Sequence, residues 1–172
     1  MTKTFDALAR AYRYPVPGRL DELRHGIDEL PEGPTRRSFA AFVDAIGALS
    51  LEAWEELHTR TLDLSPLFAP YVGYVMWGDN YQRGTFMAAL RRAQIEAGVE
   101  LDGELPDHVE SVLRYLSATD APISELEASL APSLERMESA LTKAEADSPY
   151  LHLLKATRLA LPQGDVATGG AR

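Results

Sequence analysis

Cysteine is absent from this chain of 172 residues. Disulfides, thiolate metal sites, iron–sulfur ligation and cysteine nucleophiles are therefore excluded. Long apolar runs are also missing: the most apolar stretch, Leu67 to Trp77, contains Pro70 and Gly73 and is too short to cross a bilayer. The first residues lack the apolar run and the small-residue cleavage site of a secretory signal. These absences predict a cytoplasmic protein with no direct membrane insertion.

Positive charge is scarce as well. The chain has 17 Lys and Arg against 26 Asp and Glu, a formal net charge of −9. That charge repels a phosphate backbone, and no basic cluster is dense enough to reverse it locally, so we expect no nucleic acid partner. The 45% hydrophobic and 25% charged fractions are near globular averages, and the length matches one domain.

Amphipathic helical periodicity is what the sequence does contain. It recurs along the chain, is broken at intervals by proline and glycine, and meets no competing strand-like alternation. We therefore predict an all-α fold, a single-domain irregular bundle of about eight or nine helices over residues 1–161. The tail, residues 162–172, is rich in glycine and alanine, and we expect it to be disordered.

Several residues are predicted to start or break helices. Ser124 and Glu127 have the spacing of a capping box. Pro132 is expected to separate a short helix from a longer one. Other predicted helix starts are Ser50, Asp79 or Asn80, and Pro106.

Catalytic and metal-binding patterns are lacking. The four histidines include no pair at ligand spacing, and no phosphate-binding loop, dinucleotide motif or nucleophile elbow is present, so we predict neither cofactor nor enzymatic activity. Asp107 and His108 could form an acid–base pair, but neighbours on a helix point in different directions. We instead place Asp107 in a helix first turn and pair Glu110 with Arg114 on the solvent side. His58 is predicted to be a hydrogen-bonded histidine at the core edge.

Three short segments stand in order between Leu62 and Leu116. They are LDLSP at residues 62–66, GDNYQRG at 78–84 and ELPDHVESVLRYL at 104–116. Together they resemble the delta-subunit chaperones of respiratory nitrate reductase, which belong to the wider redox-enzyme maturation family of molybdoenzyme chaperones. The chain departs from the family pattern at His58, Leu62 and Gln94.

The resemblance implies an all-helical cytoplasmic chaperone. Such a protein binds the N-terminal segment of an apo molybdoenzyme catalytic subunit, here the nitrate reductase alpha subunit, and supports molybdenum cofactor insertion and complex assembly. A chaperone for another molybdopterin oxidoreductase and a helical regulatory subunit without chaperone action remain alternatives. We expect a monomer or weak dimer. An apolar groove flanked by acidic residues would accept an amphipathic basic peptide, with apolar anchors giving affinity and charge giving steering.

The predicted peptide-binding residues come from two segments, the aromatic stretch ending at Trp77 and the Pro-Asp-His turn. Tyr and Trp carry a polar atom that needs a partner when buried, so several together suit a partly wet surface, with core packing as the alternative. The spacing of Asp79 and Arg83 predicts a salt bridge at a helix start. Asp107 and His108 are carried over from the family motif as peptide-binding or hinge positions. The predicted site residues are Tyr71, Tyr74, Trp77, Asp79, Tyr81, Arg83, Asp107 and His108.

Overall fold

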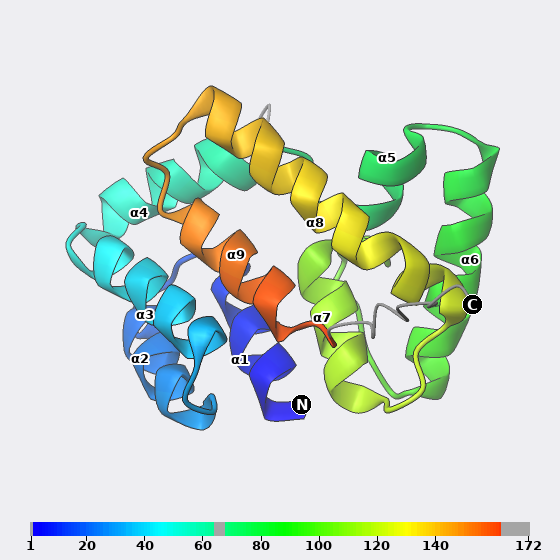
Figure 1. Ribbon diagram of the computed structural model, residues 1–172, viewed down its shortest axis with the longest axis horizontal. Helices are drawn as coiled ribbons and strands as arrows, with labels where there is room; N and C mark the ends of the chain where they lie inside the picture. The colour runs from blue at the N-terminus through cyan, green and yellow to red at the C-terminus, as the bar shows by residue number, and fades with distance from the viewer. Residues whose placement is uncertain (1, 64–67, 163–172) are drawn as a thin grey trace, which may run out of the picture.

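The computed structural model describes residues 2–63 and 68–162 of the chain. These residues form a single all-α bundle without a strand, as predicted from the periodicity (Figure 1). Most of the segment LDLSP and all but the first residue of the predicted disordered tail lie outside the described residues. The helices are α1 Thr2–Ala11, α2 Arg19–Glu29, α3 Pro34–Gly47, α4 Leu51–His58, the π-helical turn η1 Thr59–Asp63, α5 Val72–Trp77, α6 Tyr81–Glu96, α7 Val109–Ala118, α8 Ser124–Ala144 and α9 Tyr150–Ala160.

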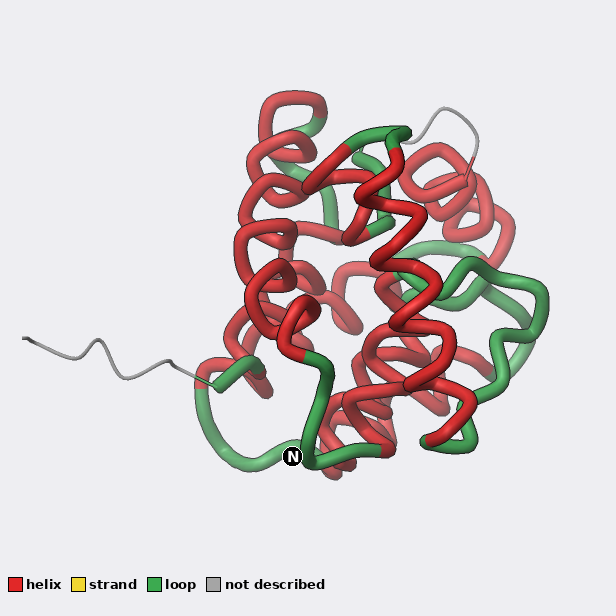
Figure 2. Tube along the Cα trace, turned by 90° about the vertical axis from the view of Figure 1, so that its right-hand side faces the viewer, coloured by secondary structure: helices red, strands yellow, loops and turns green. Residues whose placement is uncertain are grey.

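Helices distant in sequence are paired in space. α1 packs against α7 and α9, and α3 packs against α9. α8, the longest helix, runs across the molecule from α9 to α5 (Figure 1). The view turned by 90° shows the same arrangement of helices and connecting loops (Figure 2). The first and last helices are therefore neighbours in the middle of the bundle, with α2 to α4 at one end and α5 and α6 at the other.

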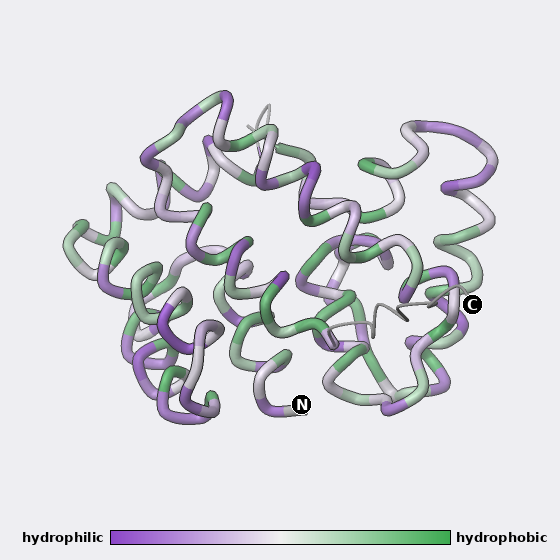
Figure 3. Tube along the Cα trace, viewed as in Figure 1, coloured by the Kyte–Doolittle hydropathy of each residue, from purple (hydrophilic) through white to green (hydrophobic). Residues whose placement is uncertain are grey.

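The core is formed where the apolar stripes of these helices meet. Hydrophobic and hydrophilic residues alternate along most helices in Figure 3, as expected for amphipathic segments. Burying a large apolar side chain contributes about 1.5–3 kcal/mol each, which is the main stabilisation of such a bundle. The fully buried large side chains include Leu8, Phe39, Phe42, Leu90, Leu113, Leu126, Leu134, Met137 and Tyr150. No helix in the described part of the chain has the length and apolarity needed to cross a membrane.

Two predicted helix starts are confirmed. The Ser50 side chain accepts a hydrogen bond from the backbone N–H of Ala53 at 3.2 Å and caps α4. Asn80, rather than Asp79, caps α6: its side chain accepts from the N–H groups of Gln82 and Arg83. Both caps satisfy backbone donors that the first helical turn leaves without a partner.

Two predictions about α8 are wrong. Ser124 is already inside the helix, its hydroxyl donates to Glu125, and Ile123 precedes the helix without a side-chain cap. Pro132 does not separate two helices, because α8 continues through it to Ala144. Proline removes one helical hydrogen bond, but α8 packs along both α5 and α9, and this tertiary burial offsets the local cost.

Candidate functional site

The start of α5 and the start of α7 are joined by two backbone hydrogen bonds. The N–H of Val72 donates to the carbonyl of Asp107 at 2.8 Å, and the N–H of Val109 donates to the carbonyl of Pro70 at 2.9 Å. This pairing is an isolated antiparallel bridge between Tyr71 and His108. It brings the aromatic segment and the Pro-Asp-His turn, which are far apart in sequence, to one place.

A buried ion pair lies beside this bridge. The side chain of Asp107 is fully buried and accepts from Nε of Arg83 at 3.0 Å and from Nη2 at 3.4 Å. Nη1 of Arg83 donates to Asp79 at 3.0 Å, which confirms the predicted salt bridge four residues apart. Arg83 thus connects an exposed carboxylate to a buried one. Two hydrogen bonds from one arginine fix the orientation of the buried carboxylate. Losing that arginine would leave an uncompensated buried charge, so the pair is expected to stay intact in the folded protein.

Two tyrosines at the start of α5 lie against the same arginine. The guanidinium of Arg83 lies 5.7 Å from the ring centroid of Tyr71 and 5.3 Å from that of Tyr74, within the range of a cation–π contact. Gly73 makes this arrangement possible, because a Cβ there would stand 2.8 Å from Oδ2 of Asp107 and 3.1 Å from Cγ of Arg83. Any side chain at Gly73 would therefore displace Asp107 or Arg83, so glycine lets α5 approach the ion pair this closely.

His108 begins α7, whereas the prediction put the helix start at Pro106 and placed Asp107 in its first turn. Nδ1 of His108 accepts from the N–H of Glu110 at 3.2 Å, so the imidazole is the helix cap. Its ring contacts Tyr71 edge-on, with centroids 5.2 Å apart. Burial lowers the pKa of His108, although the carboxylates of Glu104 and Glu110 act in the opposite direction. A neutral imidazole suits this role, because a capping nitrogen must offer a lone pair.

A cavity of about 310 Å³ lies in front of His108. We call it the His108 pocket. It is lined by the residues that follow α1, by α4 and η1, by the loop before α7 and by the first turn of α7. The residues that line it are Tyr12, Arg13, Tyr14, His58, Leu62, Asp63, Leu101, Asp102, Glu104, His108 and Glu110.

The charge in this pocket is mainly negative. Four carboxylates line it, and Arg13 is the one basic residue among the lining side chains. Glu110 pairs with Arg13 at 2.8 Å, and Asp102 pairs with Arg114 at 3.0 Å. Neither Asp63 nor Glu104 has an ion-pair partner in the described part of the chain. Burial raises the pKa of Asp63. The pocket is therefore suited to a cationic group that would neutralise these acids.

The expected solvent-side pairing of Glu110 needs correction. Glu110 is 7% exposed, and its nearer partner is Arg13, two residues beyond the end of α1, whereas Arg114 stands at 3.8 Å. The contact between α1 and α7 buries the carboxylate and supplies a partner 97 residues away in sequence. A rule based on spacing along one helix cannot anticipate such a partner.

His58 closes the opposite side of the pocket. It is 3% exposed, and Nδ1 lies 2.9 Å from the hydroxyl of Tyr150, as expected of a hydrogen-bonded histidine. Burial, with a smaller contribution from His108, lowers the pKa of His58 to about 4. The π-helical turn η1 follows directly and carries Leu62 and Asp63 into the pocket. Such turns are rare and frequently lie at functional sites.

The predicted site residues do not all meet. Tyr71, Arg83, Asp107 and His108 form one connected cluster through the contacts above. Tyr74 joins it at the surface and is 44% exposed. Trp77 packs on Phe86 at 5.1 Å between centroids and belongs to the edge of the core. Tyr81 is 89% exposed on α6. Of the eight predicted residues, His108 is the one that lines the His108 pocket.

Sequence reasoning missed most of the pocket wall. Tyr12 and Arg13 come from the N-terminal segment, which was predicted only to be helical, and Asp63 comes from the segment LDLSP, which carries the resemblance but supplied no predicted site residue. Glu104 is the first residue of the segment 104–116, and its contact with the Tyr71 hydroxyl at 3.4 Å was not predicted. A π-helical turn can point to a functional site, but the sequence periodicity does not distinguish it from an α-helix, so η1 was not predicted. No group of His, Asp or Glu in the described residues is arranged to hold a metal ion.

Comparison with known proteins adds no assignment: neither a family model nor a curated protein sequence matches this chain.

Proposed function

We propose that this protein is a redox-enzyme maturation chaperone that binds the N-terminal segment of an apo molybdoenzyme catalytic subunit. The nitrate reductase alpha subunit is the first candidate client, because the three segments between Leu62 and Leu116 resemble the delta-subunit chaperones. Binding would hold the subunit competent for insertion of its molybdenum cofactor. Another molybdopterin oxidoreductase as client and a purely regulatory helical subunit are the alternatives.

One observation carries this proposal. The segments 78–84 and 104–116, which carry the resemblance, meet through Arg83 and Asp107 at the edge of the His108 pocket. If the resemblance were accidental, there would be no reason for the two segments that carry it to be in contact. The two segments meet next to the His108 pocket, whose carboxylates complement the positive charge of a basic peptide segment.

The division of roles follows from burial. Asp107 and Arg83 position the turn and are too enclosed to reach a peptide without rearrangement. Glu104 and Asp63 offer carboxylates without an ionic partner to a Lys or Arg of the client. Tyr14, 47% exposed at the pocket mouth, supplies apolar contact area with a polar tip.

A calorimetric titration with a synthetic peptide of the first residues of the alpha subunit tests the proposal. We expect a dissociation constant in the micromolar range, or about −8 kcal/mol. Asp63→Asn combined with Glu104→Gln should weaken binding about tenfold, whereas Asp44→Asn combined with Asp147→Asn, which removes the same charge at exposed positions elsewhere, should change it less than about twofold.

Absence of binding to the intact protein would contradict the chaperone assignment for this client. Binding only to the N-terminal peptide of another molybdopterin oxidoreductase would instead change the client. Equal weakening by both double variants would show that overall charge, and not the His108 pocket, accounts for the affinity.

A further inference from the structure

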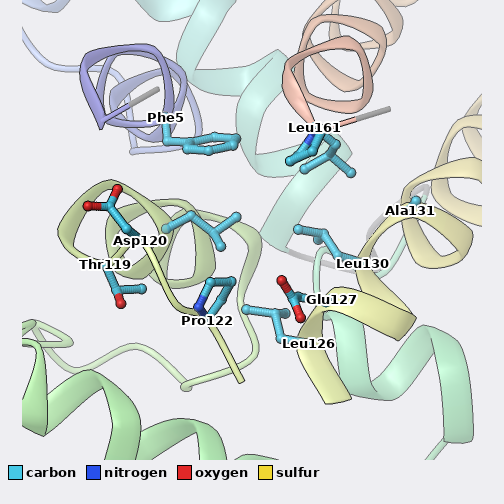
Figure 4. A pocket seen from close by; sticks show the side chains of 11 residues that line it. Phe5, Thr119, Asp120, Pro122, Leu126, Glu127, Leu130, Ala131 and Leu161 are labelled. Atoms are coloured by element: carbon cyan, nitrogen blue, oxygen red, sulfur yellow. The ribbon is translucent and has the colours of Figure 1, made fainter. Parts of the chain in front are cut away.

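A second cavity, of about 320 Å³, lies where α1, α7, α8 and the end of α9 meet. We call it the apolar pocket. Its apolar wall is formed by Phe5, Leu116, Pro122, Leu126, Leu130 and Leu161. Figure 4 shows Phe5, Leu126 and Leu161 converging from separate elements. Phe5, Leu126 and Leu130 belong to the buried core, so this part of the wall is held by packing.

The charged side chains of the apolar pocket are both acidic. Asp120 and Glu127 lie on opposite sides of it in Figure 4. Neither forms an ion pair with a residue in the described ranges, and no Lys or Arg is among the lining residues. This differs from the His108 pocket, where Glu110 and Asp102 have arginine partners. A ligand that complements this pocket therefore combines an apolar group for the wall with a positive charge for the two acids.

We propose that the apolar pocket is a docking site for a large apolar side chain carried by a basic segment of a partner protein. The apolar side chain would fill the cavity, and flanking Lys or Arg residues would pair with Asp120 and Glu127. Its volume is at the lower end of the ~300–1,000 Å³ typical of ligand sites, which suits one or two side chains. The site is separate from the His108 pocket, and the proposal holds whichever client the chaperone serves.

Charge favours this occupant over two others. A second copy of this chain, with a net charge of −9, would bring further negative charge toward the two acids. An anionic membrane surface would be repelled in the same way. A basic amphipathic segment is attracted, and its apolar residues at helical spacing match a groove between helices.

The test uses a fluorescein-labelled amphipathic peptide made only of leucine and lysine at helical spacing, with fluorescence anisotropy at physiological salt. We expect micromolar binding, and at least tenfold weaker binding to Ala131→Trp, whose side chain would fill the cavity. Asp120→Asn with Glu127→Gln should weaken binding about fivefold, equivalent to about 1 kcal/mol. A peptide with glutamate in place of lysine should not bind.

One control separates this site from general charge attraction. Asp44→Asn with Asp147→Asn removes the same charge from exposed positions elsewhere and should leave peptide binding within about twofold of the unmodified protein. Asp63→Asn with Glu104→Gln neutralises the other pocket, and the weakening caused by Asp120→Asn with Glu127→Gln should be the same in that background. Circular dichroism and urea unfolding of each variant establish that it is folded, and the Asp120 and Glu127 variant remains decisive if Ala131→Trp does not fold.

Three results would overturn the proposal. Binding unaffected by both pocket variants would place the peptide elsewhere. A nuclear Overhauser effect between Val166 and Leu126 in the free protein would show that the chain's own C-terminal segment occupies the pocket. Dimerisation that Ala131→Trp abolishes would make a second copy the occupant.

Discussion

The two pockets have nearly the same volume, but one has a mainly polar lining and the other a mainly apolar one. The His108 pocket combines four carboxylates, two buried histidines and an arginine, beside the buried pair of Arg83 and Asp107. The apolar pocket is lined by aliphatic and aromatic side chains, with two acids that have no cationic partner in the described residues. The first region is held together by hydrogen bonds and ion pairs, and the second by packing. We therefore expect the two regions to respond differently to mutation and pH.

The largest effect is expected for Asp107→Ala. Removing the buried carboxylate leaves Arg83, whose side chain is 11% exposed, with Asp79 alone. The free energy of unfolding should fall by about 3 kcal/mol. Asp79→Ala is the matched control on the same arginine and should cost less than about 1 kcal/mol, since Asp79 is 86% exposed. Urea denaturation measures both, and equal losses would contradict the special role of the buried pair.

Leu126→Ala probes the apolar pocket and should cost about 2–3 kcal/mol. Leu126 is fully buried, so the change removes apolar contacts and enlarges an existing cavity. The loss should be the same at low and high salt, because no charge is involved. Leu105→Ala, at a leucine that is 43% exposed, is the control and should cost less than about 1 kcal/mol. A salt-dependent loss for Leu126→Ala would show that the two regions are not as distinct as their linings suggest.

The pH dependence should come from the His108 pocket. The pKa of His58 is about 4 in the folded protein, below its value of 6.5 in the unfolded chain, so the unfolded chain binds the proton more tightly. The contribution of neutral His58 to the free energy of unfolding is therefore fully present above pH 6.5. It is lost as the pH falls toward 4, by about 1 kcal/mol per pH unit. The lowered pKa of His108 acts in the same direction.

Urea unfolding between pH 7 and pH 5 measures this slope. His58→Gln should reduce it, whereas Leu126→Ala should lower stability equally at every pH and leave the slope unchanged. An unaltered slope in His58→Gln would assign the acid sensitivity to other groups.

Local rules predicted those features that depend on neighbours along one helix. The pairing of Asp79 with Arg83 follows from their separation of four residues, and the Asn80 cap follows from its place before an amphipathic run. The same rules failed for Glu110, because its main partner is Arg13. They also failed for Pro132, where packing of α8 on two other helices outweighs the local preference.

The sequence alone determined the helical class, the approximate helix positions and the acidic net charge, because these depend on periodicity and composition. Tertiary structure decided that Asp107 is buried against Arg83, that His58 and His108 face one cavity, and that Phe5 meets Leu126 and Leu161 in another. The physical reason is that burial and desolvation depend on which helices meet. Contacts such as α1 with α7 join residues about a hundred positions apart, which no local pattern records.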